Sequence, residues 1–126
     1  MTESAENRVK RADRLFEKAM AAHRDGRLDE AIAGYVEALE INPESSRAYN
    51  NMGVALRARG AFHAAAASYR RAIAIKSSDP GSHSNLGNAL RALGRHGEAE
   101  ASHRQALALD PDYLEARYNL GLVLKD

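Results

Sequence analysis

A fixed spacing of thirty-four residues organises almost the whole chain. Gly26, Gly60 and Gly94 are separated by this interval, and alanines follow each glycine at offsets of five and twelve residues. A constant period of this length is typical of an array of identical supersecondary units, in which each unit packs mainly on its neighbours. We therefore expect an elongated solenoid with a long surface, which suits binding better than catalysis.

Each unit contains two helical patterns on either side of the repeated glycine. In residues 49–60, Met52, Ala55 and Leu56 recur at helical spacing, and Gly60 is suited to end the helix. No segment shows the sustained polar–apolar alternation of a half-buried strand. The predicted fold class is therefore all-α. The second pattern of the middle unit carries one apolar stripe, formed by Ala65, Tyr69, Ala72 and Ile73.

Prolines and small residues refine these helices. Asn42-Pro43 and Asp110-Pro111 are predicted to close second helices, because a residue before proline avoids the α region. Asp79-Pro80 instead predicts an N-cap and the first residue of a helix. One position of the first helix holds a small residue in every unit: Ala19, Gly53, Gly87 and Gly121. These small residues are expected to let the second helix approach closely through Ala31, Ala65 or Ala99.

Composition excludes several classes of protein. The 126 residues carry a formal net charge of only +1, which disfavours a polyanion-binding surface, and nucleic acid is not an expected partner. The absence of cysteine excludes disulfides and thiolate chemistry. The polar N-terminal stretch lacks the apolar core of a secretory signal, and no apolar run approaches the roughly 20 residues of a membrane span. We expect a cytoplasmic protein without a membrane partner.

Taken together, these features resemble tetratricopeptide repeats: Leu/Met-Gly in the first helix, Gly between helices, Ala-Tyr-Ala in the second helix and Pro near its end. The resemblance implies a right-handed α-solenoid of antiparallel helix pairs, with seven helices in about three and a half repeats. Repeats are placed at residues 12–45, 46–79 and 80–113, with 114–126 as a partial fourth. Residues 1–11 form either a polar extension of the first helix or a disordered segment.

The family resemblance also implies that the first helices line a concave face, and asparagines recur there at the repeat period. The fragments YNNMGVAL, HSNLGNAL and RYNLGLVL resemble the superhelical repeats of O-linked N-acetylglucosamine transferases. In that family an asparagine ladder holds an extended polypeptide by its backbone. Asn51, Asn85 and Asn119 match that ladder, whereas the first unit has Glu17 at the same place. The alternative is that these amides only face water.

The predicted peptide-binding groove has apolar and polar walls and a cationic edge. Its walls are Met20, Val54, Asn88 and Leu122. Its edge is formed by His23, Arg57, Arg91 and Lys125, which would favour an acidic peptide. Some family members clamp the terminal carboxylates of heat-shock chaperones with cations. This chain has Asp13, Glu17 and Gly81 at the corresponding places, so we do not expect a chaperone-tail adaptor.

No catalytic, metal or cofactor site is predicted. His96, Glu100 and His103 share a helical spacing, but His103 occupies the register of the packing residues Tyr35 and Tyr69. The third unit has His83 and His103 where its neighbour has Tyr49 and Tyr69, and we expect the two histidines to meet. Protonation of both would then place like charges together.

The last predicted helix is apolar on more than one side, which marks an interaction surface. Its self-association residues are predicted to be Tyr118, Leu120, Leu122, Val123 and Leu124. Three functions follow from the sequence: a non-catalytic scaffold that binds an extended peptide, a module that associates with itself, and the substrate-recruiting arm of a larger glycosyltransferase.

Overall fold

The computed structural model describes residues 2–125, and this part of the chain forms seven α-helices and no strand. Met1 and Asp126, which belong to the predicted N-terminal extension and partial fourth repeat, lie outside the described residues. The helices are α1 (Ala5–Arg24), α2 (Leu28–Ile41), α3 (Ser46–Ala58), α4 (Phe62–Ile75), α5 (Pro80–Ala92), α6 (His96–Leu109) and α7 (Leu114–Lys125). The all-α prediction is confirmed. None of these helices combines the length and apolar character that a membrane span requires.

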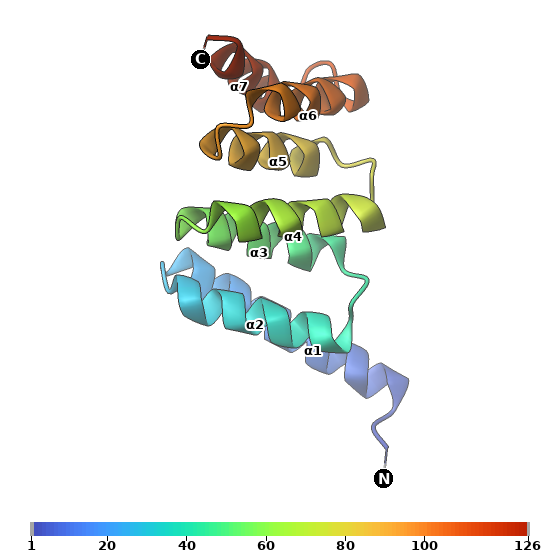
Figure 1. The fold of residues 1–126 in the computed structure, drawn as a ribbon. Coiled ribbons are helices and arrows are strands. Elements are labelled where there is room, and N and C mark those ends of the chain that lie inside the picture. The colour runs from blue at the N-terminus through green and yellow to red at the C-terminus, as the bar shows by residue number, and fades with distance from the viewer. Residues whose placement is uncertain (1, 126) are drawn as a thin grey trace.

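The helices stack as pairs in chain order, and the two termini lie at opposite ends of the array (Figure 1). The closest associations are within the pairs α1–α2, α3–α4 and α5–α6. The backbones of successive odd-numbered helices also approach one another, whereas within residues 2–125 those of the even-numbered helices do not. Between even-numbered helices, the side chain of Arg70 on α4 reaches Glu98 on α6 at 3.8 Å. The array therefore curves toward the odd-numbered helices, which form an inner layer.

Glycine ends the first helix of each complete pair. Gly26, Gly60 and Gly94 have φ angles of 78°, 88° and 77°, in the left-handed region that side chains with a Cβ disfavour. In each turn the residue after the glycine donates its N–H to a carbonyl five residues earlier, as Ala61 does to Leu56 at 2.9 Å. This arrangement is the Schellman motif, so the repeated glycine sets the reversal between paired helices.

The predicted helix boundaries at proline are also observed. α2 ends one residue before Asn42, and α6 ends one residue before Asp110. Asp79 caps α5 by accepting a hydrogen bond from the N–H of Gly81 at 3.0 Å, and Pro80 is the first residue of that helix. Local sequence therefore fixes where the helices begin and end.

Close packing within the pairs depends on rings that lie against small residues. A Cβ added to Gly53 would lie 2.5 Å from the ring of Tyr69, and one added to Gly87 would lie 2.6 Å from the ring of His103. Nearest to these two glycines are ring atoms, so the predicted approach of Ala65 and Ala99 stays a prediction. The longer side chain one turn further along each second helix reaches across to the glycine.

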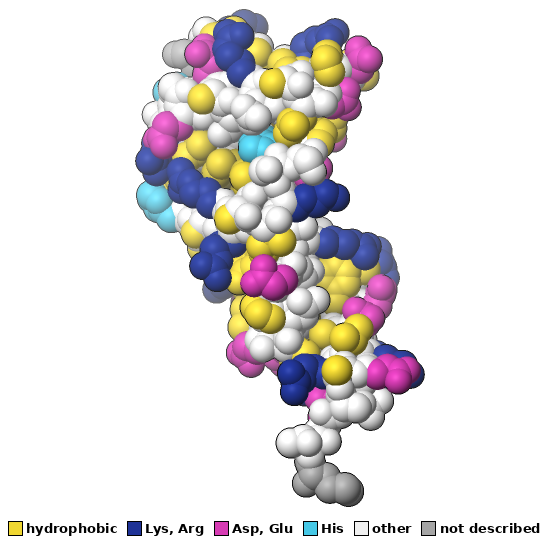
Figure 2. Space-filling view, turned by 90° about the vertical axis from the view of Figure 1, so that its right-hand side faces the viewer, with side chains coloured by type: hydrophobic (Ala, Val, Ile, Leu, Met, Phe, Trp, Pro, Cys, Tyr) yellow, Lys and Arg dark blue, Asp and Glu magenta, His cyan; other side chains and the backbone are white. Residues whose placement is uncertain are grey.

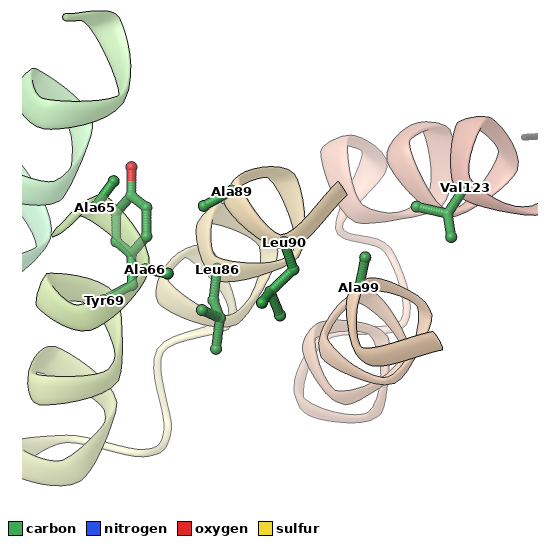
Figure 3. Close-up of a cluster of buried hydrophobic side chains, with 8 residues drawn as sticks. All are labelled: Ala65, Ala66, Tyr69, Leu86, Ala89, Leu90, Ala99 and Val123. Carbon is green, nitrogen blue, oxygen red and sulfur yellow. The ribbon is translucent and has the colours of Figure 1, made fainter. Parts of the chain in front are cut away.

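Many of the buried residues between positions 2 and 125 fall in two hydrophobic clusters along the array. The larger one joins α4, α5, α6 and α7 through Ala65, Ala66, Tyr69, Leu86, Ala89, Leu90, Ala99 and Val123 (Figure 3). The smaller one joins α1, α2 and α3 through Ala19, Ala22, Ala31, Tyr35 and Ala55. Because each cluster spans a junction between repeats, burial of apolar surface holds the pairs in a continuous stack.

Candidate binding face on the inner helix layer

The three predicted ladder asparagines lie on successive inner helices, and each is half-buried. Asn85 of α5 donates a hydrogen bond from its side-chain nitrogen to the side-chain oxygen of Asn50 on α3, at 3.2 Å. This bond joins neighbouring inner helices and orients the Asn85 amide. An amide has two N–H donors and an oxygen acceptor, so one such bond leaves Asn85 with further bonding capacity.

A hollow of about 240 Å³ lies at the junction of α1 and α3. It is lined by Met20, His23, Arg24, Tyr35 and Asn51. The structure thus brings together one member each of the predicted ladder, wall and cationic edge. The hydroxyl group of Tyr35 is hydrogen-bonded to Nδ1 of His23 at 3.1 Å, which holds the imidazole at the rim. The hollow offers an apolar side chain, a cation and an amide to one inserted group.

The remaining predicted groove residues differ in accessibility. Arg57 and Arg91 are half-buried, whereas Lys125 is exposed. Val54 packs partly against the larger core cluster, so only part of its surface is available to a ligand. The half-buried wall residues are Val54, Asn88 and Leu122. The sequence analysis did not predict a role for Asn50. Its position next to Asn51 in the sequence could have indicated that it lies near the ladder.

The buried tyrosine hydroxyls lie near the cationic edge. Burial raises the pKa of Tyr69 to about 12, and the nearby positive charge of Arg57 opposes that rise. Burial likewise raises the pKa of Tyr35, against the opposing charges of Arg24 and Arg47. Each tyrosine therefore remains a neutral hydroxyl at physiological pH.

The two histidines of the third repeat have separate partners, so the prediction that they meet is wrong. Nε2 of His83 bonds the carbonyl oxygen of Ser77 at 2.9 Å. His103 is fully buried against Gly87, and its Nδ1 lies 3.4 Å from the hydroxyl oxygen of Ser84. No hydrogen bond or ring contact joins the two imidazoles within residues 2–125. Burial lowers the pKa of His103.

No group of three or more potential ligands within residues 2–125 is placed to hold a metal ion. His96 is exposed at the start of α6, whereas His103 is buried on the side facing α5. Acidic and basic side chains are scattered with hydrophobic ones between them over the face shown in Figure 2. This face carries no extended basic stripe of the kind that tracks a nucleic-acid backbone.

The predicted self-association residues divide between the surface and the core. Tyr118 and Leu124 are exposed, and Leu120 and Leu122 are half-buried. Val123 is buried in the larger core cluster and is not available to a partner (Figure 3). Sequence reasoning missed Leu114, which is also exposed at the start of α7.

Comparison with known families agrees with this architecture. The family model described as TPR repeat matches residues 21–56, 53–94 and 87–126. The chain belongs to the TPR repeat family. No curated protein sequence matches it.

Several solved TPR domains share the fold. The first TPR of Spaghetti (RPAP3), bound to the HSP90 peptide SRMEEVD, is 27% identical with a TM-score of 0.89, and the match covers 92% of each chain. The Arabidopsis OM64 TPR domain is 25% identical with a TM-score of 0.90, covering 94% of this chain and 98% of that one. The first TPR domain of human RPAP3 is 27% identical with a TM-score of 0.87, covering 90% of each chain.

Proposed function

We propose that this chain is a non-catalytic scaffold that holds an extended peptide along its inner helix layer. The observation that carries the proposal is the row of Asn51, Asn85 and Asn119, one on each of three successive inner helices. The resemblance to the asparagine ladder of O-linked N-acetylglucosamine transferases supports the same role. The similar RPAP3 domain was solved with a bound peptide, which supports a peptide ligand for this fold.

An extended chain that crosses the inner helices would meet them at regular intervals. Packed helices lie about 8–10 Å apart, and an extended strand advances about 3.3 Å per residue. Equivalent asparagines on adjacent helices therefore meet every third peptide bond. Three rungs require a segment of roughly seven to nine residues. Contacts to the backbone at this interval tolerate many sequences.

The asparagines alone give weak binding. A net hydrogen bond contributes about 0.5–1.5 kcal/mol, so three amides supply ~2–4 kcal/mol, whereas a micromolar complex needs about 8 kcal/mol. We propose that the hollow at Asn51 supplies part of the difference by accepting one side chain of the peptide. Its apolar floor at Met20 and its neighbouring cations suit a side chain that combines a hydrocarbon stem with a negative end, such as glutamate.

The cationic edge favours an acidic peptide. The edge residues recur once per repeat on the inner helices, six positions after the ladder register, so a negatively charged ligand along the ladder would meet them in succession: His23, Arg57, Arg91 and Lys125. Attraction between charges that solvent reaches is screened within about 8 Å at physiological ionic strength. Affinity for acidic peptides is therefore expected to fall as salt rises, while backbone recognition persists.

The test is selection of nonapeptides from a random displayed library, followed by calorimetric titration. Replacing Asn51, Asn85 and Asn119 with alanine is expected to weaken selected peptides about 30- to 1000-fold, the equivalent of ~2–4 kcal/mol. Gln105→Ala, an exposed amide on the outer helix α6, is the matched control and should bind normally. Undiminished binding by the triple variant would rule out the ladder.

A second candidate function is the substrate-recruiting arm of a larger glycosyltransferase. The fragments that resemble the transferase repeats favour it, and the peptide groove would serve the same purpose there. The test is the natural gene: a glycosyltransferase domain encoded in the same reading frame supports this role. A complete reading frame without such a domain leaves the scaffold function alone.

A further inference from the structure

The side of α7 that faces away from the core forms an apolar surface. Leu114, Tyr118 and Leu124 are 72%, 69% and 59% exposed. Together with Gly121 they recur at four- and three-residue steps, which places them on one side of a helix. Ala116 and Val123 are buried on the opposite side. We call the four residues Leu114, Tyr118, Gly121 and Leu124 the outer face of α7.

Gly121 repeats a position that receives a ring elsewhere in the array. Its counterparts two and one repeats earlier, Gly53 and Gly87, each lie against a ring with no room for a Cβ. At Gly121 no atom lies within 4 Å of an added Cβ, and the glycine is exposed. The outer face of α7 therefore contains an open glycine in the register that receives a ring at Gly53 and Gly87.

The outer face also carries an exposed ring. Tyr118 precedes Gly121 by three residues, yet its side chain does not cover that glycine. We propose that a second copy of this chain covers the outer face, with the two α7 helices antiparallel about a two-fold axis. The Tyr118 ring of each copy then lies on Gly121 of the other. A self-complementary pair of this kind is the usual geometry of a two-fold interface.

Charge favours the antiparallel arrangement. Glu115 lies in the first turn of α7 and Lys125 in its last turn. When Tyr118 opposes Gly121 in an antiparallel pair, Glu115 of each copy lies beside Lys125 of the other. A parallel pair would instead place like charges together. The opposed helix dipoles favour the antiparallel pair as well.

The contact involves one helix of 12 residues from each copy. Specific stable interfaces bury about 1,200–2,000 Å² in total, and two short helices provide less than this. The expected dimer is therefore weak and forms with rising protein concentration.

Sedimentation equilibrium of the 126-residue chain from 10 μM to 1 mM tests the dimer, with the concentrations chosen to bracket weak association of about 10⁻⁴ M. Gly121→Ala adds one methyl group where the ring must lie, and is expected to weaken the dimer about tenfold or more. The same change should raise the thermal midpoint of the dilute monomer, because the position is open and alanine favours a helix. We therefore expect the Gly121→Ala variant to lose the dimer while its monomer stays folded or becomes more stable.

Gly97→Ala is the matched control, because Gly97 lies on α6 and its added Cβ also meets nothing within 4 Å. It should dimerise like the unchanged chain. Tyr118→Ala should weaken the dimer as strongly as Gly121→Ala. A monomer at every concentration, or equal association of the Gly121→Ala and Gly97→Ala variants, would overturn the proposal.

Charge reversal tests the register. Glu115→Lys and Lys125→Glu are each expected to weaken association, and the double variant is expected to restore it. The two residues stand ten positions apart on one helix, so restoration requires a contact between copies. Circular dichroism of each dilute variant verifies that α7 still folds. Failure of the double variant to restore association would exclude the antiparallel arrangement.

Discussion

The hydroxyl groups of Tyr35 and Tyr69 occupy equivalent places in successive repeats but have different surroundings. Both rings are fully buried. The Tyr35 hydroxyl bonds His23, whereas that of Tyr69 has no hydrogen-bond partner within residues 2–125. The cause is the residue at the cationic edge, which is histidine in the first repeat and Arg57 in the second. A buried hydroxyl without a partner costs about 1–3 kcal/mol.

Replacing each tyrosine with phenylalanine is therefore expected to give opposite results. Tyr35→Phe should lower the free energy of unfolding by about 0.5–1.5 kcal/mol, because it removes a hydrogen bond and leaves Nδ1 of His23 without its partner. Tyr69→Phe should leave the free energy of unfolding unchanged or raise it by up to about 1 kcal/mol. Urea denaturation at pH 7 measures both. Equal losses would mean that the Tyr69 hydroxyl has a partner in solution.

His103 makes stability depend on pH. Burial lowers its pKa in the folded protein below the ordinary value near 6.5, so the unfolded chain takes up the proton first as pH falls. Full stability is therefore present above pH 6.5 and declines below it. In His103→Tyr, which introduces the tyrosine that the first two repeats carry at this position, unfolding free energy should change less between pH 7.5 and 5. An unchanged pH profile in that variant would assign the dependence to other groups.

At the scale of the helix, the contact between paired helices depends on one glycine in each of two repeats. Gly53→Ala gains about 1 kcal/mol of helix propensity, but the methyl group would lie within 3 Å of the Tyr69 ring. Overpacking of this kind costs about 1–3 kcal/mol. We expect a net loss in unfolding free energy, measured by urea denaturation against Gly97→Ala, whose position is open. A Gly53→Ala protein as stable as that control would show that the ring can move aside.

The helices were predictable from sequence because their signals are local. Glycine at positive φ, Asn-Pro and Asp-Pro pairs, and the Asp79 cap each act within a few residues of the boundary they set. The contacts between helices were less predictable. A repeat period shows which positions are equivalent in successive repeats, but it does not show which side chains touch across a helix pair. It did not show that the ring of Tyr69 reaches across to Gly53.

In the candidate site, too, equivalent positions could be predicted from the sequence, whereas side-chain contacts could not. The period placed Asn51, Asn85 and Asn119 on equivalent parts of the inner helices, but it did not indicate the bond from Asn85 to Asn50. That bond joins residues thirty-five positions apart, one more than the period, so it links different registers. Likewise, the shared aromatic positions of His83 and His103 suggested a contact, but each ring turns toward a different partner.

At the scale of the whole molecule, the stack is held together by neighbours alone. α7 contacts only α5 and α6, and α1 contacts only α2 and α3, among the described helices. The central helices are covered from both sides. In such an array local opening costs least at the ends, because fewer interfaces are broken there.

Hydrogen exchange measured by mass spectrometry should therefore show a gradient along the chain. Protection is expected to be highest in α3, α4 and α5. It is expected to be lowest in α7 and in residues 5–11 of α1, and every residue of that segment of α1 is exposed. Raising the protein concentration should slow exchange in α7 alone, because the proposed dimer covers only that helix. Uniform protection along the chain would mean that the repeats unfold as one cooperative unit instead of opening from the ends.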